Sequence, residues 1–233
     1  MDHRRVRDIL LLVLTINAGA VDVLSYLGLQ RVFTANMTGN MVLLALSAGS
    51  GEEFGAIRAA CACLGYVAGA LTGARLVNVT RTPEVWPRRV TEAIYLELAL
   101  LALVAIGWHL TATAPARPWL EVLIAVSACA MGLQSAAAAR LAVPGISTTY
   151  VTGTLTSLMA ELAALSGRSS WGLRAGVVVS VAIGAAANAV ILRHWPPGAV
   201  LLPLTLIIAV AVTASRSFKT AAPASSAVAA GAT

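Results

Sequence analysis

Long apolar runs constrain this chain more than any other feature of its sequence. Several approach the ~20 residues that a helix needs to cross a bilayer. Only 11% of the 233 residues are charged, against about 25% in soluble domains, and the short alternating segments of a transmembrane β-barrel are not visible. The sequence therefore predicts an all-α integral membrane protein. Its eight apolar segments are Ile9–Leu29, Phe33–Ser47, Ile57–Val77, Ala93–Leu110, Leu120–Ala139, Ile146–Leu165, Trp171–Leu192 and Ala199–Ala214.

A short polar motif occurs twice within these segments. The first copy, Phe33–Asn40, reads FTANMTGN, and a degenerate second copy, Ser147–Thr154, reads STTYVTGT. Thr34, Thr38 and Gly39 match Thr148, Thr152 and Gly153, while Asn36 and Asn40 fall opposite Tyr150 and Thr154. Such side chains around a glycine could bind a desolvated solute or cation, or they could cap and join helices. We favour the functional interpretation because both copies keep the Thr-Gly pair.

The rest of the chain also divides into two similar halves. Gly19 and Asp22, before the first motif, fall opposite Gly132 and Ser135, and the glycine-rich third segment falls opposite the seventh. We therefore predict one transmembrane domain over residues 1–214, with repeat A at about 9–110 and repeat B at about 120–214. The Ala-, Ser- and Pro-rich tail, 215–233, is predicted to be disordered. Duplicated halves with a site at their interface are common in secondary transporters.

The basic residues flanking the apolar segments distinguish two topologies. The net charge is +6, and basic loop residues gather on the cytoplasmic side of membrane proteins. If segments 2 and 6 enter and return on one side, most basic residues share a side, whereas eight crossings nearly remove the bias. The sequence favours six spans in two inverted halves, a cytoplasmic N-terminus and a motif near the tip of each re-entrant segment, with eight spans as the alternative. Basic residues interleaved with aromatics, typical of nucleic-acid binding, are absent.

Polar side chains inside the apolar segments are further candidates. Asp22 lies well inside the first segment, where a charge costs about 3 kcal/mol or more. It could accept a coupling proton, bind a cation or hold a structural partner, and Asn17 could share its pocket. Gln134 and Ser135, at the corresponding place in the second half, could line the same cavity. Glu97 is interpreted instead as an interface or ion-pair residue, with a proton carrier as the alternative.

Enzyme motifs are missing from the sequence. It contains no nucleophile elbow, P-loop, HExxH motif or dinucleotide fingerprint. The three cysteines and three histidines are scattered, without the spacing of metal ligands. We therefore expect no enzymatic activity, no metal site and no cofactor.

These motifs carry a family resemblance. The stretch GAVDVLSYLGLQRVFTANMTGNMVLL, with the later GLQSAAAAR and TTYVTGTLT, resembles the YoaK-like family of uncharacterised bacterial inner-membrane proteins over about residues 9–214. The resemblance implies a multi-pass protein of the bacterial inner membrane and implies no particular activity. The candidate substrate- or ion-binding residues from the motifs and the resemblance together are Asp22, Thr34, Asn36, Thr38, Gly39, Asn40, Gln134, Ser135, Thr148, Thr149, Tyr150, Thr152, Gly153 and Thr154.

The function predicted from these observations is secondary transport of a small solute. Its site would lie where the two Thr-Gly segments meet, and Asp22 could couple transport to H⁺ or Na⁺. One alternative is a passive channel, which by analogy with a K⁺ filter needs four loops and therefore a homodimer. Another is a non-transporting scaffold that binds partners through the row Gly65, Gly69 and Gly73. The expected partners are membrane lipid and a small solute or ion.

Overall fold

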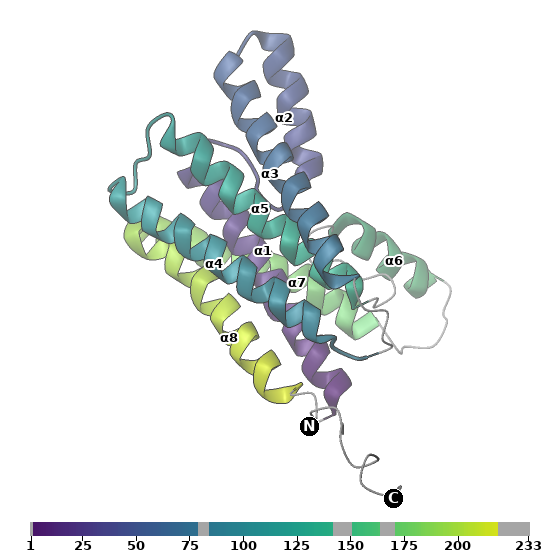
Figure 1. The fold of residues 1–233 in the computed structure, drawn as a ribbon. Helices are drawn as coiled ribbons and strands as arrows, with labels where there is room; N and C mark the ends of the chain where they lie inside the picture. Colours follow the sequence, from purple (N-terminus) through teal and green to yellow (C-terminus); the bar gives the residue numbers. More distant parts are fainter. Residues whose placement is uncertain (1, 79–83, 142–150, 164–170, 219–233) are drawn as a thin grey trace, which may run out of the picture.

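The computed structural model describes residues 2–78, 84–141, 151–163 and 171–218. Within these ranges the chain forms helices, turns and loops, which confirms the predicted all-α class (Figure 1). The elements are α1 (His3–Gly28), α2 (Met37–Ser50), α3 (Glu53–Val77), α4 (Arg88–Leu110), α5 (Trp119–Arg140), α6 (Val151–Ala163), α7 (Trp171–His194), the 3-10 helix η1 (Pro196–Val200) and α8 (Leu201–Ser217).

Six helices are long and apolar enough to cross a bilayer, and α2 and α6 are not among them. The six are α1, α3, α4, α5, α7 and the continuous pair η1–α8. With 14 residues, α2 is about 21 Å long at 1.5 Å per residue, which is short of a hydrocarbon core of about 30 Å. The described part of α6 has 13 residues and is also shorter than the hydrocarbon core. These lengths agree with six spans rather than eight.

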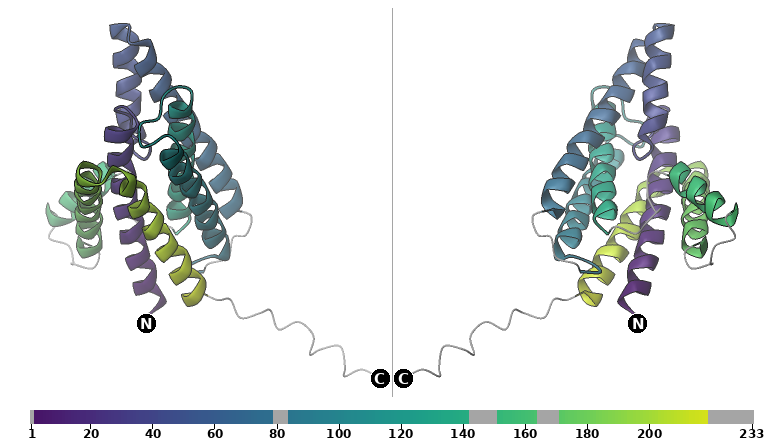
Figure 2. Two further views of the ribbon diagram at one scale, coloured as in Figure 1. Left: turned by 90° about the vertical axis from the view of Figure 1, so that its left-hand side faces the viewer. Right: turned by 90° about the vertical axis from the view of Figure 1, so that its right-hand side faces the viewer.

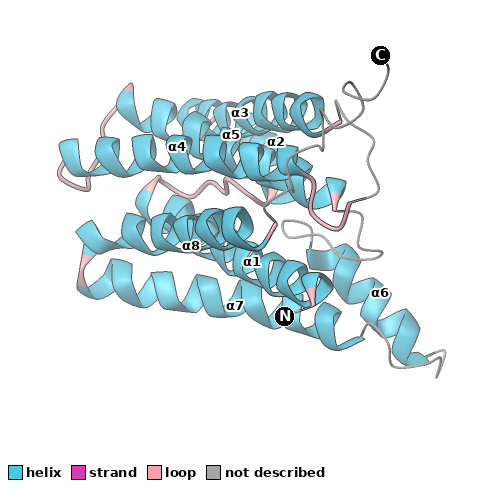
Figure 3. Cartoon of the chain, turned by 60° about the horizontal axis from the view of Figure 1, so that its bottom comes forward, coloured by secondary structure: helices cyan, strands magenta, loops and turns pink. Residues whose placement is uncertain are grey.

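The spanning helices form two layers. Helices α3 and α4 pack on α5 in one layer, and α7 and α8 pack on α1 in the other (Figure 3). The layers meet mainly where α4 contacts α8 and where α1 passes α5. The first helix of each half of the sequence therefore packs with later helices of the other half.

A row of glycines lets α3 and α5 lie backbone to backbone. A methyl group added at Gly65 would overlap the carbonyl oxygen of Ala125, and one at Gly69 would overlap that of Cys129. Gly73 continues the row against the next turns of α5. Because the contacts advance along both helices together, α3 and α5 run parallel. The row is covered by α5 of the same chain, so it is not the external contact face of the scaffold alternative.

Helices α1 and α7 approach each other in the same way. A methyl group at Gly184 would overlap the carbonyl oxygen of Ile16, and one at Gly19 would overlap that of Val181. Nearer the start of both helices, Gly176 lies against Leu12. The two helices are therefore also parallel, and small residues again set their separation.

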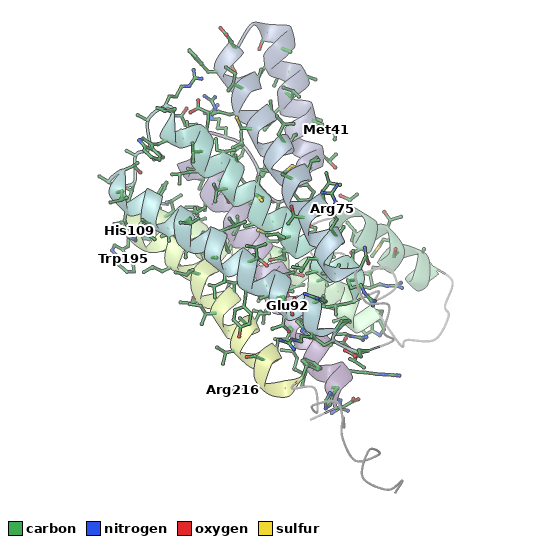
Figure 4. The ribbon with its side chains drawn as sticks, in the orientation of Figure 1. Met41, Arg75, Glu92, His109, Trp195 and Arg216 are labelled. Atoms are coloured by element: carbon green, nitrogen blue, oxygen red, sulfur yellow. The ribbon has the colours of Figure 1, made fainter. Side chains whose placement is uncertain are left out.

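Aromatic contacts tie together each end of the bundle. At one end the Phe218 ring, just after α8, stacks on Trp86 and packs edge-on against His3. At the other end Trp108 of α4 donates a hydrogen bond to the carbonyl oxygen of Pro196 at 3.1 Å. Figure 4 shows His109 and Trp195 at this second end, far from Arg216. The N-terminal end of α1 and the C-terminal end of α8 therefore lie on the same side of the bundle.

Between α1 and α2 the chain turns back beside α1. Gln30 and Arg31 adopt positive φ angles of 61° and 63°, and the following residues return to the level of Asp22 before α2 begins. Helix α2 then runs outward and pairs with the start of α3 through a turn at Gly51 (φ 76°), so this hairpin projects beyond the other helices (Figure 2). For the first motif, this path agrees with the expected re-entrant segment.

The outer surface of the helices is strongly apolar. Leu64 on α3, Leu103 on α4 and Val190 on α7 are each more than half exposed. Met41 of α2 is 64% exposed and points away from the bundle (Figure 4). Such side chains are expected where lipid rather than water surrounds the helices.

We expect Gly69→Ala to destabilise the protein by about 1–3 kcal/mol, the usual cost of forcing an extra methyl group into a packed core. The added Cβ would collide with the backbone of α5, which cannot rotate away. Gly49→Ala on α2 is the matched control, because nothing lies within 4 Å of its Cβ position. Thermal unfolding in detergent measures both, and equal melting temperatures would contradict the close α3–α5 contact.

We expect cysteines placed at Asp2 and Glu52 to lie on opposite sides of the membrane. Asp2 precedes α1 at one end of the bundle, while Glu52 lies in the α2–α3 turn beyond the other end. A membrane-impermeant maleimide, applied to oriented vesicles of a variant without native cysteines, reports each position. Labelling of both from the same side would contradict the six-span arrangement.

Candidate functional site

Three fully buried polar side chains meet where α1 crosses α4 and α5. The Asn17 Nδ2 donates to Oε1 of Glu97 at 3.1 Å and to Oε1 of Gln134 at 2.9 Å. The Gln134 Nε2 donates in turn to the carbonyl oxygen of Leu14 at 3.0 Å. All three side chains are 0% exposed. This polar cluster (Asn17, Glu97 and Gln134) joins the two layers in the middle of the bundle.

The polar cluster is not fully satisfied. The Oδ1 of Asn17 and the Oε2 of Glu97 are buried and have no hydrogen-bond partner among the described residues. Leaving a buried polar atom unpaired costs about 1–3 kcal/mol. Two unpaired buried polar atoms in one cluster lower the stability of the bundle, and side-chain packing gives no reason for them.

The interpretation of Glu97 as an interface or ion-pair residue is wrong. Its side chain is completely buried, and none of the salt bridges among the described residues includes it. The ion pairs of α4 belong instead to Glu92, which contacts Arg88 at 3.4 Å and Arg89 at 2.6 Å at the end of the helix.

Asp22 holds the returning segment in place. Its Oδ1 accepts backbone N–H groups of Thr34 at 3.0 Å, Ala35 at 2.7 Å and Asn36 at 3.4 Å. These N–H groups precede α2 and have no helical partners of their own. Asp22 therefore anchors the first Thr-Gly motif to α1.

The first motif builds a closed loop followed by a helix cap. The Asn40 side chain accepts the Phe33 N–H at 2.9 Å and donates to the Phe33 carbonyl oxygen. The Asn36 Oδ1 caps α2 by accepting the Gly39 N–H at 3.4 Å. At Gly39 a Cβ would lie 2.9 Å from the Phe33 ring, so a small residue is needed there. These contacts favour the capping interpretation for Asn36, Gly39 and Asn40, while Thr38 is exposed.

A buried chain of hydroxyl groups connects this loop to both layers. The Ser127 Oγ on α5 donates to the Thr34 Oγ1 at 3.1 Å, and the Thr34 hydroxyl donates to the Ser25 Oγ at 3.4 Å. The Ser25 hydroxyl ends the chain on the carbonyl oxygen of Asp22 at 3.0 Å. Thr34 is thus the motif residue that faces the bundle interior.

Two further polar contacts flank the polar cluster. The Tyr66 hydroxyl on α3 donates to the Ser135 Oγ at 2.8 Å, and Ser135 donates to the Met131 carbonyl oxygen at 2.9 Å. On α7, the Asn188 Nδ2 donates to the carbonyl oxygen of Ala20 at 2.7 Å, while its buried Oδ1 has no partner within the described chain. Polar groups therefore follow the seams between α1, α5 and their neighbours.

The second motif lies partly outside the described residues. Ser147, Thr148, Thr149 and Tyr150 lie outside the described residues, whereas Thr152, Gly153 and Thr154 lie in the first turn of α6. Thr152 is exposed and Thr154 is buried. Helix α6 packs on α7 at one flank, while α2 packs on α3 at another (Figures 1 and 2). The described residues of the two motifs therefore lie apart, while the rest of the expected common site falls outside the described residues.

Sequence reasoning found part of the central arrangement and missed the rest. It selected Gln134, and it placed Asn17 beside Asp22 rather than beside Glu97. It missed Tyr66 and Ser127, because neither residue type is unusual inside a membrane helix. The signal available for Glu97 was its position well inside an apolar segment, the argument already applied to Asp22. Among the described residues, no three Cys, His, Asp or Glu side chains gather as a metal site would require.

Comparison with known proteins places the chain in a family. A family model described as "Protein of unknown function (DUF1275)" matches residues 10–213. The chain belongs to this family. It is 33% identical over 219 residues to "UPF0700 transmembrane protein YoaK" of Bacillus subtilis (strain 168), covering 89% of this chain and 94% of that protein. No solved structure matches. The relative's name agrees with the membrane assignment and names no substrate.

We expect Asp22→Ala to lower the free energy of unfolding by about 2–4 kcal/mol, because it leaves backbone N–H groups of the returning segment without a charged acceptor. Asp22→Asn retains an acceptor oxygen and should cost about 1 kcal/mol. Asp8→Ala removes only a partly exposed pair with Arg7, worth less than about 1 kcal/mol. Chemical or thermal unfolding in detergent ranks the three variants, and an Asp22→Ala protein as stable as Asp8→Ala would refute the anchoring role.

Proposed function

We propose that this protein is a secondary carrier of a small solute. The observation that carries the proposal is a correspondence between the two close helix crossings, α1 with α7 and α3 with α5. Inverted repeats that meet at the membrane midplane are a recurrent architecture of secondary transporters.

The correspondence holds residue by residue. One constant shift along the sequence takes Ile16 and Gly19 of α1 to Cys129 and Gly132 of α5, and another takes Tyr66, Gly69 and Ala70 of α3 to Val181, Gly184 and Ala185 of α7. In the α1–α7 crossing Ile16 contacts Gly184, and in the α3–α5 crossing the matching residue Cys129 contacts Gly69. Likewise Gly19 contacts Val181 and Ala185, and its counterpart Gly132 contacts the matching residues Tyr66 and Ala70. Two crossings built from matching residues support an internal repeat.

The two halves run in opposite directions through the membrane. Gln134, late in α5, contacts Leu14 in the middle of α1. Ser127, earlier in α5, contacts Thr34, which lies beside Asp22 and therefore nearer the C-terminal end of α1. The first helices of the halves are therefore antiparallel. Because each layer combines helices of both halves, rocking one layer against the other could open the bundle alternately to each side. The polar cluster lies between the layers, where such a motion would expose it.

Arginine placement supports a cytoplasmic N-terminus. One end of the bundle carries Arg4, Arg5, Arg7, Arg75, Arg88, Arg89, Arg140, Arg174 and Arg216, and the other carries Arg31, Arg58, Arg117 and Arg193. Basic residues close to spanning helices favour the cytoplasmic side. We therefore assign the start of α1 and the end of α8 to the cytoplasmic face of a bacterial membrane.

Solute-induced currents in reconstituted vesicles would test the carrier proposal. The probes are single amino acids, organic acids, sugars, nucleosides and quaternary ammonium ions, each applied with and without a pH gradient. A carrier gives a current that saturates with solute concentration. Asn17→Ala should reduce that current because it removes the donor that joins Glu97 and Gln134, whereas Leu64→Ala on the exposed face of α3 should not.

The other function classes predict different results. A conductance that rises in proportion to concentration and follows voltage would indicate a channel. The absence of any response, together with a stable co-purifying protein, would indicate a scaffold. Equal currents in Asn17→Ala and wild type would remove the polar cluster from the transport pathway.

A further inference from the structure

We propose that Glu97 is the residue that binds and releases a proton as the helix layers move, with Asn17 and Gln134 holding its carboxyl group in position. This inference names the coupling site of the proposed carrier and therefore rests on that function. Its first test concerns the proton on Glu97 and needs no solute.

The first argument is the environment of the carboxyl group. Within the described chain only one of its oxygens, Oε1, receives a hydrogen bond, and that bond comes from the neutral amide of Asn17. The other oxygen, Oε2, is buried and has no partner among the described residues. An ionised carboxylate in an apolar interior is costly unless it is paired, and such a group usually becomes neutral by taking up a proton.

The second argument is the pair of unpartnered atoms. In the part of the chain that the structure describes, the buried Oδ1 of Asn17 has no donor and the buried Oε2 of Glu97 has no partner. A proton on Glu97 converts an acceptor-only carboxylate into a hydroxyl donor. Uptake of one proton therefore supplies the kind of group that this cluster lacks, whereas a metal cation would require several more free oxygens around it.

The third argument is the distribution of the other charges and titratable groups. The charged and titratable groups on the helices around Glu97 are His3, Arg4, Arg5, Arg7, Asp8, Asp22 and Tyr26 of α1, Glu53, Arg58, Cys61, Cys63, Tyr66 and Arg75 of α3, Arg88, Arg89, Glu92, Tyr95 and His109 of α4, Glu121, Cys129 and Arg140 of α5, and Arg216 of α8. Arg7 pairs with Asp8, Asp22 accepts loop N–H groups, and Tyr66 donates to Ser135. No ion pair with Glu97 is present among the described residues, so a proton is the available neutralising charge.

The fourth argument is position. Glu97 belongs to the layer of α3, α4 and α5, whereas its hydrogen-bond donor Asn17 belongs to the opposite layer. Movement of the layers would change this contact directly. Asp22 is less suited to carrying the proton, because its Oδ1 already accepts the backbone N–H groups of Thr34 and Ala35.

Infrared difference spectroscopy of the protein in lipid vesicles tests the proposal directly. The carbonyl stretch of a protonated carboxylic acid is separate from the bands of carboxylates. Over a pH titration, wild type should show the band of a buried protonated carboxyl group. Glu97→Gln should lose this band, Glu97→Asp should restore it at a shifted position, and the control Glu92→Gln should keep it. An unchanged band in Glu97→Gln would overturn the proposal.

A labelling experiment keeps the test independent of how the variants fold. Isotope-labelled glutamate in the wild-type protein should shift the band, whereas labelled aspartate should leave it unchanged. A shift with aspartate alone would assign the proton to an aspartate and overturn the proposal. Loss of the band on adding NaCl at constant pH would show that sodium competes for the site, and would also overturn it.

A second experiment connects the proton to transport. Vesicles containing a pH-sensitive dye are exposed to whichever solute probe produces the saturable current, and exchange of that radiolabelled solute is measured in parallel. Glu97→Gln should lose solute-driven proton movement and keep solute exchange, while Glu92→Gln should keep both. Proton movement that persists in Glu97→Gln would overturn the proposal. If no probe is transported but the infrared band behaves as expected, the carrier function fails and the proton assignment stands.

Discussion

Close approach of helix backbones at glycine residues determines the arrangement of this protein. Between membrane helices the hydrophobic effect contributes little, so association depends on packing and on interhelical hydrogen bonds. Gly65 and Gly69 set α3 directly against α5, and Gly19 and Gly184 set α1 directly against α7. These two contacts fix the two layers, and the layers fix which side chains face one another at the centre. A larger residue at any of these positions would push the two helices apart and so displace the other helices of that layer as well.

The buried polar groups are of two kinds, those whose hydrogen bonds are satisfied and those that keep an unpaired atom. Around the returning segment the polar atoms are paired: Asp22 accepts N–H groups, Asn40 brackets Phe33, and hydroxyl groups connect Ser127 to Ser25. Such a network specifies one conformation of the loop. In the polar cluster, by contrast, one amide oxygen and one carboxyl oxygen have no hydrogen-bond partner among the described residues. The first Thr-Gly motif is thus largely explained by structure, and the less conspicuous Glu97 is the stronger candidate for function.

Much of the fold could be predicted from the sequence, because apolar length and flanking polarity report directly on membrane helices. The third, fifth and seventh apolar segments end within a few residues of α3, α5 and α7. Helix α2 begins at Met37 rather than at Phe33, since Asn36 caps it and the preceding residues pair with Asp22. The site was harder to predict. Asn17, Glu97 and Gln134 are far apart in the chain, and nothing local specifies which faces of three helices will meet. The first Thr-Gly motif has a recognisable sequence because its loop and helix cap require particular residue types. Such a requirement of the fold does not by itself indicate a function.

The exchange of first helices between the layers has a consequence for how the protein is made. Helix α1 is synthesised first, but α7, the helix against which it packs along most of its length, is among the last to be synthesised. Until α4 and α5 arrive, Asn17 has neither Glu97 nor Gln134 to bond with. The early half of the chain can therefore pair Asn17 with Glu97, but it lacks Gln134 and leaves the face of α1 that contacts α7 uncovered. Completion of the fold depends on contacts distant in sequence, which form late, so the two halves become a stable unit only together.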